Sequence, residues 1–165
     1  MTVVSNTSPI INLAAIGQLE LLQQLYTHII IPEQVYNEIV VQGAGQPGAM
    51  AVQNTSWFER RIVGNQAALD QLLARNRKLH VGEAAAIMLA VEINAQRILL
   101  DESIGRAVAA ELGVPVTGVL GILIAAKQRG IIPSVKPLVD DLTDTAHFWI
   151  TPALYDRVLA AAGER

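Results

Sequence analysis

The chain has 165 residues, of which 52% are hydrophobic and 16% are charged, and its formal net charge at pH 7 is −3. This balance predicts one folded domain over residues 1–165 and excludes a disordered chain. The absence of cysteine excludes disulfides and thiolate metal sites. The negative net charge argues against binding of nucleic acid through a broad basic surface. No apolar run reaches membrane-spanning length, so we expect a cytoplasmic protein without a membrane partner.

The first strand-to-helix unit surrounds Asn6. Residues 2–5 are β-prone, and residues 10–26 have a helical pattern of apolar residues that is interrupted near Gly17. Ser8 is suited to cap this helix. Asn6 therefore lies between the end of a strand and the start of a helix, where a simple turn residue is a strong alternative.

The second unit contains the first acidic candidate, Glu38. An apolar run at residues 28–31 predicts a buried strand, and Pro32 begins a helix over residues 33–42. Glu38 lies beside the core-facing residues of this helix. A solvated position at the margin of the apolar stripe is the alternative for this side chain.

The middle of the chain combines a basic run with a carboxylate on an apolar stripe. Arg75, Arg77 and Lys78 belong to the densest basic run, which directly precedes Glu83. A solvated helix end explains these cations, and a phosphate-contacting patch is the alternative. A helical pattern over residues 82–94 places Glu83 on the core-facing stripe, in the first turn, where the helix dipole favours negative charge. An unpaired carboxylate there is costly, so a purely structural role explains Glu83 poorly.

The most informative stretch is the apolar run at residues 98–100, which ends in Asp101 and Glu102. A helical pattern over residues 104–112 follows. Ligands of open α/β sheets bind at the carboxyl edge of such strands, so the arrangement favours a site residue here. A cap on the following helix, made by Asp101 or Ser103, is equally consistent with it.

The alternation of strands and helices predicts a single α/β domain with a central, mainly parallel sheet and helices on both faces. Asn6 and Asp101 would project from strand ends of this sheet. Glu38 and Glu83 would reach the same edge from helices. Clustered carboxylates repel unless a cation neutralises them, and oxygen ligands favour Mg²⁺ or Mn²⁺ over zinc. The other predicted elements are an edge strand at residues 57–63, a strand at 114–117, and helices at 66–74, 118–129, 133–142 and 151–162.

Five short motifs occur in a characteristic order. They are Val-Val-Ser-Asn-Thr-Ser-Pro-Ile-Ile at residues 3–11, Ile-Pro-Glu-Gln-Val-Tyr-Asn-Glu-Ile at 31–39, Gly-Glu-Ala-Ala-Ala-Ile at 82–87, Leu-Leu-Asp-Glu at 99–102 with Gly-Arg at 105–106, and Gly-Val-Leu-Gly at 118–121. They resemble motifs of the PIN-domain family, and the resemblance extends over nearly the whole chain. The resemblance is closest to a prokaryotic branch related to the ribonuclease toxins of VapBC-type toxin–antitoxin pairs.

The resemblance implies a metal-dependent endoribonuclease that hydrolyses a phosphodiester and leaves a 5′-phosphate, with Mg²⁺ or Mn²⁺ as cofactor. The implied catalytic residues are Asn6, Glu38, Glu83 and Asp101, and the implied metal ligands are these four and Glu102. We expect RNA contacts from Ser8, Arg75, Arg77, Lys78 and Arg106. Because relatives commonly pair, we expect a homodimer, and the implied partners are an RNA substrate and an antitoxin protein.

Asn6 departs from the family's pattern, which has aspartate at the end of the first strand. An amide keeps one oxygen as a ligand but removes a charge from the site, and this loss weakens metal binding. The sequence therefore leads to two hypotheses. One is a metal-dependent ribonuclease, the toxin of a toxin–antitoxin pair, attenuated by Asn6. The other is a non-catalytic PIN-fold module that binds RNA or a protein.

Overall fold

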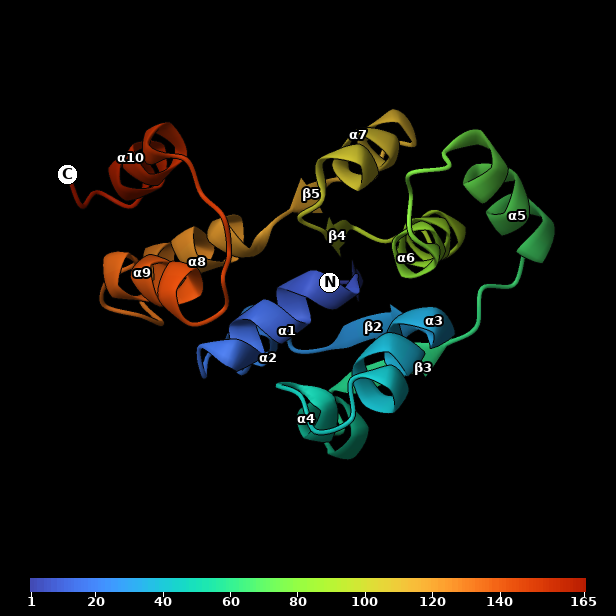
Figure 1. Cartoon of the computed structure of the whole chain (residues 1–165), viewed down its shortest axis with the longest axis horizontal. Helices are drawn as coiled ribbons and strands as arrows, with labels where there is room; N and C mark the ends of the chain where they lie inside the picture. Colours follow the sequence, from blue (N-terminus) through green and yellow to red (C-terminus); the bar gives the residue numbers. More distant parts are fainter.

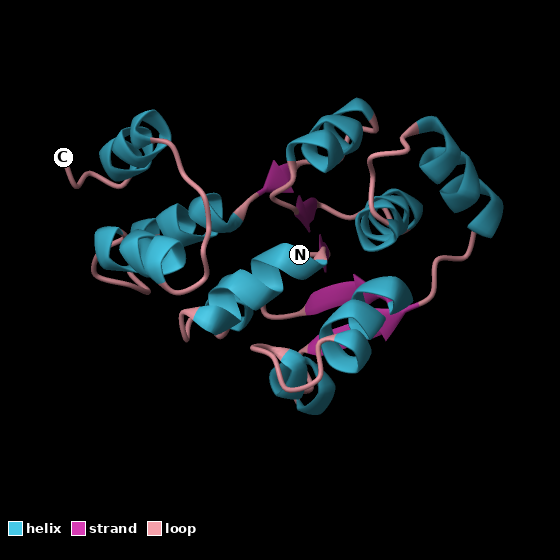
Figure 2. Ribbon diagram, viewed as in Figure 1, coloured by secondary structure: helices cyan, strands magenta, loops and turns pink.

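The structure is a computed structural model that describes residues 1–165, and its centre is a five-stranded sheet (Figures 1 and 2). All neighbouring strands are parallel. The strands are β1 (Val3–Ser5), β2 (Ile29–Pro32), β3 (Phe58–Arg61), β4 (Arg97–Leu99) and β5 (Val116–Thr117). They lie in the order β3-β2-β1-β4-β5. The predicted parallel sheet is confirmed, and the strand predicted at an edge is the edge strand β3.

The three inner strands are buried on both faces, which is why they read as short continuous apolar runs. Successive side chains of a strand point to opposite faces. Ile29 and Ile31 therefore belong to one hydrophobic cluster of 24 buried residues, and Ile30 belongs to the other cluster, of 17. Val3 and Val4 divide between the two clusters in the same way.

Helices cover both faces of the sheet, as predicted (Figure 2). The larger cluster includes side chains from α1 (Thr7–Ala15), α2 (Leu21–Tyr26), α4 (Ala49–Asn54), α8 (Val119–Gln128), α9 (Lys136–Asp144) and α10 (Pro152–Ala161). The smaller cluster includes side chains from α5 (Gln66–Arg75), α6 (Val81–Glu92) and α7 (Ser103–Glu111). Helices α8, α9 and α10 lie together at one end of the molecule (Figure 1). None of the helices has the length and apolar character needed to cross a lipid bilayer.

Two helices differ in detail from the periodic patterns. The pattern over residues 10–26 is divided into α1 and α2 near Gly17, as expected, and this glycine adopts a φ of +72°, a left-handed conformation that other residues rarely adopt. The helix expected over residues 33–42 is α-helical only as α3 (Glu33–Tyr36) and continues as the π-helix η1 (Asn37–Gln42). Apolar spacing does not reveal such a change of hydrogen-bond pattern.

The strand order creates a crevice between β1 and β4. From β1 the chain proceeds through β2 to β3 on one side of the sheet, and it then returns to β4 and β5 on the other side. Ligands of open α/β sheets bind beyond the carboxyl ends of the strands at this reversal. Asn6 follows β1, and Asp101 and Glu102 follow β4, so the topology itself brings these side chains to the crevice.

Candidate active site

An acidic hollow of about 360 Å³ opens in this crevice. None of the side chains around it is hydrophobic. They come from four segments: the start of α1, the π-helix η1, the start of α6, and the link between β4 and α7. The residues are Asn6, Thr7, Ser8, Glu38, Gln42, His80, Glu83 and Glu102.

Asn6 is buried at the start of α1 and holds Glu102 in place. Its backbone N–H donates to Leu99 O at 3.0 Å, which extends the pairing of β1 with β4 by one residue. Its Nδ2 donates to Glu102 Oε2 at 3.2 Å, and Ser8 Oγ donates to Glu102 Oε1 at 2.7 Å. Both oxygens of Glu102 therefore accept hydrogen bonds from the first helix. An aspartate at position 6 would replace the amide donor with a second negative group.

Glu38 reaches the hollow from the first turn of η1. Thr7 Oγ1 donates to Glu38 Oε2 at 2.5 Å, a contact that joins α1 to η1. The other oxygen lies against Gly82, where a Cβ atom would collide with it. Gly82 thus allows α6 to approach the carboxylate closely. Single π-helical turns occur frequently at functional sites, and this one carries a site carboxylate.

Glu83 is only 3% exposed and lies at the third position of α6. Its Oε1 accepts the backbone N–H of His80 at 3.1 Å, whereas its buried Oε2 has no hydrogen-bond partner. Burial raises the pKa of Glu83, and nearby Glu102 raises it further, against the opposing effect of the His80 N–H. Gly105 of α7 lies so close that a Cβ there would be 2.8 Å from Oε2. A buried acceptor without a donor is costly, so helix capping explains only one of the two oxygens.

Asp101 is not among the residues that line the acidic hollow. Its Oδ1 accepts the backbone N–H of Val119 at 2.9 Å, so it caps α8, and α7 is preceded by Glu102 without a side-chain cap. Its Oδ2 is buried without a partner. Burial raises the pKa of Asp101 to about 6, Glu102 adds to the rise, and the Val119 N–H and Arg106 oppose it. Asp101 lines an adjoining hollow of about 660 Å³.

The structure therefore brings Asn6, Glu38 and Glu83 together with Glu102, and it places Asp101 next to them in a separate hollow. Of the four implied catalytic residues, three line the acidic hollow and Asp101 lines the adjoining one, so the catalytic role of Asp101 stays a prediction. Consecutive residues after β4 point in different directions, and Glu102 is the one that faces Asn6.

The residues expected to contact RNA are divided among three places. Ser8 lies in the acidic hollow, and Arg106 lies in the adjoining hollow, where its Nη1 donates to Leu100 O at 3.1 Å. Arg75, Arg77 and Lys78 are exposed at the end of α5 and in the link to α6, and they line none of the hollows.

Sequence reasoning missed several residues that shape the site. Thr7 orients Glu38, and Gly82 and Gly105 leave space for carboxylates. These residues lie within the sequence motifs, and only that position could have pointed to them. Their partners are distant along the chain: Thr7 and Glu38 are 31 positions apart.

The donor chemistry of the acidic hollow fits a hard divalent cation. Its ligands would be oxygens alone, from Asn6 and the three carboxylates, and Mg²⁺ and Mn²⁺ prefer such oxygens. The partnerless Oε2 of Glu83 also indicates a missing positive group. In the conformation described, hydroxyl and amide donors hold Glu38 and Glu102, and no three acidic or histidine side chains lie close enough together to hold one ion. Cation binding therefore requires these carboxylates to turn inward.

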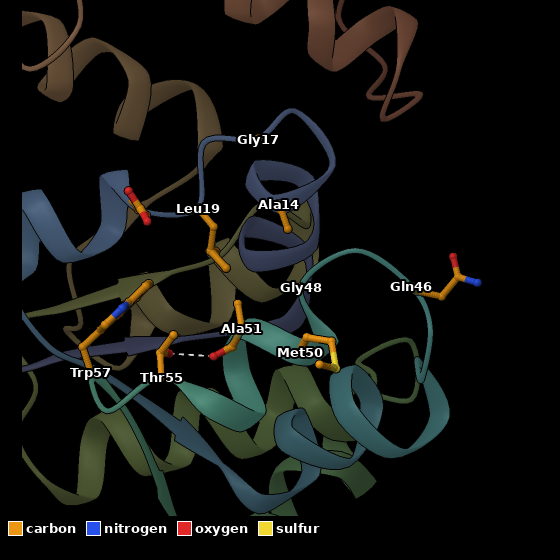
Figure 3. A pocket seen from close by; sticks show the side chains of 10 residues that line it. Ala14, Gly17, Leu19, Gln46, Gly48, Met50, Ala51, Thr55 and Trp57 are labelled. Atoms are coloured by element: carbon orange, nitrogen blue, oxygen red, sulfur yellow. Dashed lines mark hydrogen bonds between the residues drawn. The ribbon is translucent and has the colours of Figure 1, made fainter.

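A further hollow, of about 510 Å³, lies between the end of α1 and α4 (Figure 3). Leu19, Met50 and Trp57 contribute to its wall, and Thr55 donates to Ala51 O inside it. Glu20 is its only ionisable lining residue. It lacks the clustered acids that distinguish the crevice between β1 and β4.

The comparison with known families agrees with this geometry. A family model described as a PIN domain matches residues 2–164, which is nearly the whole chain. No curated protein matches the sequence. A parallel sheet with an acidic crevice at its topological reversal and a family match over its full length lead to one conclusion: the chain belongs to the PIN-domain family, whose fold is of the nuclease type.

Proposed function

We propose that this protein is a metal-dependent endoribonuclease whose reaction centre is the acidic hollow. The observation that carries the proposal is the state of Glu83, a buried carboxylate with one partnerless oxygen in a hollow shared with two further acids. Such a cluster is unfavourable without a cation. A structural role as a helix cap leaves this cost unexplained.

The residues of the hollow have separate tasks in this proposal. Thr7 donates to Glu38, while Ser8 and Asn6 donate to Glu102, so these donors keep the two carboxylates at the hollow until a cation draws them inward. Glu83 has a raised pKa because it is buried, which suits it to accept a proton from an attacking water. A bound Mg²⁺ or Mn²⁺ would neutralise the acids, activate water and stabilise charge at the attacked phosphorus. Asp101 supports the site from the adjoining hollow by holding the start of α8.

Asn6 attenuates the activity in this account. Its amide donates to Glu102 and so partly satisfies a carboxylate that would otherwise be available to a cation. The same hydrogen bond favours the second candidate, a non-catalytic PIN-fold module that binds RNA or a protein. In that case the acids are stabilised by internal donors and need no metal.

We also propose that the protein is the toxin of a toxin–antitoxin pair and forms a homodimer in the cytoplasm. The motif resemblance supports the first part, and exposed apolar side chains support the second: Ile11, Val41 and Met50 lie on or near the first helices and are open to solvent. Growth arrest on expression, relieved by the product of the adjacent reading frame, would support the toxin role. A light-scattering mass near 17.7 kDa at micromolar concentration would contradict the dimer.

The catalytic proposal is tested by cleavage of a mixed RNA pool with Mg²⁺, with Mn²⁺ and with a chelator. We expect cleavage that the chelator abolishes and that Glu83→Gln removes. The matched control is Glu111→Gln, which neutralises an exposed acid of α7 outside the hollow and should leave cleavage unchanged. RNA that stays intact under all metal conditions, but is retained by the protein, would overturn the nuclease proposal in favour of the binding module.

A further inference from the structure

The adjoining hollow differs in character from the acidic hollow. It lies between α7, β5, α8 and the segment that follows α9, and at about 660 Å³ it is the largest hollow of the fold. Polar and apolar side chains both line it, among them Ser103, Arg106, Thr117, Leu120 and Phe148. The exposed Arg106 supplies positive charge, and the one acid, Asp101, is held by the Val119 N–H. A lining of polar and apolar side chains that includes the guanidinium of Arg106 suits a ligand that is both aromatic and anionic.

The two hollows are neighbours along one edge of the sheet. Glu102 lines the acidic hollow, and the residues on either side of it, Asp101 and Ser103, line the adjoining hollow. A chain that is cleaved in the first would therefore extend into the second. Thr7 and Glu38 of the acidic hollow also line another hollow, of about 320 Å³.

The segment between α9 and α10 contributes the aromatic part of this surface. Phe148 lines the adjoining hollow and is half-buried, and Phe148 and Ile150 pack against the larger hydrophobic cluster. Trp149, between them, is 81% exposed. By contrast, Trp57 is 9% exposed and stacks on Phe58 with the ring centroids 4.1 Å apart. An exposed tryptophan that directly follows a residue lining a hollow indicates a binding surface, because its large apolar area favours burial.

We propose that the adjoining hollow, together with the exposed Trp149 that follows its lining residue Phe148, is a subsite for an unpaired nucleotide of single-stranded RNA. Phe148 and Trp149 supply aromatic surface for a base, and Arg106 supplies charge for a phosphate next to the scissile one. Stacking of this kind requires a base whose face is free, so double-stranded RNA is excluded from the subsite. The inference rests on the proposed ribonuclease function and deepens it by naming the residues that would hold the RNA strand beside the reaction centre.

Binding is measured by the anisotropy of a labelled six-nucleotide single-stranded RNA of mixed sequence, with Mg²⁺ present and Glu83→Gln as the common background. Base–aromatic stacking contributes about 1–3 kcal/mol per base, so Trp149→Ala should weaken binding by about 5- to 150-fold. Trp149→Phe should restore much of the affinity. The control is Ile62→Ala, which removes a similarly exposed apolar side chain directly after the edge strand β3. It should bind like the background protein.

A second readout does not depend on substitution of the proposed surface. In Trp57→Phe, the remaining tryptophan emission comes from Trp149. Single-stranded RNA should quench this emission and shift it to shorter wavelength, and a duplex of the same length should not. Arg106→Gln should weaken binding and reduce its salt dependence, because a phosphate contact is lost.

The outcomes separate the subsite from the catalytic proposal. Chelator-sensitive cleavage by the wild type, together with unchanged RNA affinity in Trp149→Ala and Arg106→Gln, would overturn the subsite and leave the nuclease standing. RNA binding that depends on Trp149 without any cleavage would support the subsite and overturn the nuclease. If Trp149→Ala changes the oligomeric mass in light scattering but not the affinity for RNA, Trp149 belongs to a protein interface and the subsite is overturned.

Discussion

The acidic hollow and the adjoining hollow each contain a carboxylate in almost the same local setting. Glu83 accepts the N–H of His80 at the start of α6, and Asp101 accepts the N–H of Val119 at the start of α8. In both, the second oxygen is buried without a partner, and burial raises the pKa. Their surroundings differ: Glu83 shares its hollow with two other acids, and Asp101 faces Arg106.

Burial and a raised pKa therefore do not by themselves identify a reaction centre. A helix cap with one hydrogen-bonded oxygen and one buried, partnerless oxygen produces the same signature as a metal ligand or a general base. The neighbours decide between these roles. Several acids without a cation favour metal binding, whereas a single acid beside a guanidinium favours a structural and substrate-binding role.

The matched exchanges Glu83→Gln and Asp101→Asn test this distinction most directly. Both remove a charge and keep the shape of the side chain. We expect Glu83→Gln to lower cleavage by about 10²- to 10⁴-fold, because a positioned proton acceptor contributes on this scale. Asp101→Asn keeps the acceptor for the Val119 N–H and should lower cleavage by less than tenfold. Initial cleavage rates on one RNA substrate with Mg²⁺ measure both effects. Equal losses of rate in the two variants would contradict the different roles assigned to Glu83 and Asp101.

The pH dependence of stability tests the state of Asp101. Its pKa rises on folding from an ordinary value of 3.8 to about 6. Between these values the folded chain holds a proton that the unfolded chain has lost, so the free energy of unfolding falls as pH rises from 4 to 6 and is then constant. The expected fall is about 3 kcal/mol for this shift of about two units.

Denaturant unfolding of the metal-free protein at several pH values measures this fall. Asp101→Asn should remove most of it, because the neutral amide keeps the cap without an ionisable proton. Glu83→Gln should remove a further part, since the pKa of Glu83 is also raised. A variant Asp101→Asn that keeps the full pH dependence would show that the proton resides elsewhere.

Asn6→Asp tests whether an added negative charge in the acidic hollow strengthens metal binding. We expect divalent metal affinity, measured by calorimetric titration, to increase by about tenfold, in line with the 10- to 100-fold effects of disturbing metal-site partners. Chelator-sensitive cleavage should rise with it. Without metal the same variant should be less stable, because the donor to Glu102 becomes a second negative group. Unchanged affinity and cleavage would contradict the role assigned to Asn6 and favour the non-catalytic module.

Thr7→Val should have the smallest effect. It removes the hydroxyl that donates to Glu38 at 2.5 Å and leaves a side chain of similar size. We expect a two- to fivefold loss of cleavage, since a hydrogen bond to a partly solvated carboxylate makes a modest net contribution of about 1 kcal/mol. Thr143→Val is the control, because that hydroxyl donates to Val139 O within α9, away from the hollow. Equal rates for both variants would mean that Glu38 needs no positioning.

Much of this molecule follows from the sequence alone. Short apolar runs bounded by polar residues located the inner strands, and their strict burial on two faces required a parallel sheet under helices. Asn6 was placed at a strand end and Glu83 in the first turn of a helix, as the structure has them. These features depend on local periodicity and on the carboxyl-edge rule for parallel sheets, so the chain order suffices to derive them.

Only the tertiary structure decided which acid after β4 faces the site. The sequence favoured Asp101, but the free N–H at the start of α8 binds this side chain, and Glu102 turns to Asn6 and Ser8 instead. The basic run of Arg75, Arg77 and Lys78 likewise proved to lie outside every hollow. Neighbouring residues in a short link point in different directions, and the choice between them depends on partners that lie far away along the chain. Local sequence patterns do not reveal those partners. The sequence therefore determined which edge of the sheet bears the site. The packing of α1 and α8 determined which side chains form it.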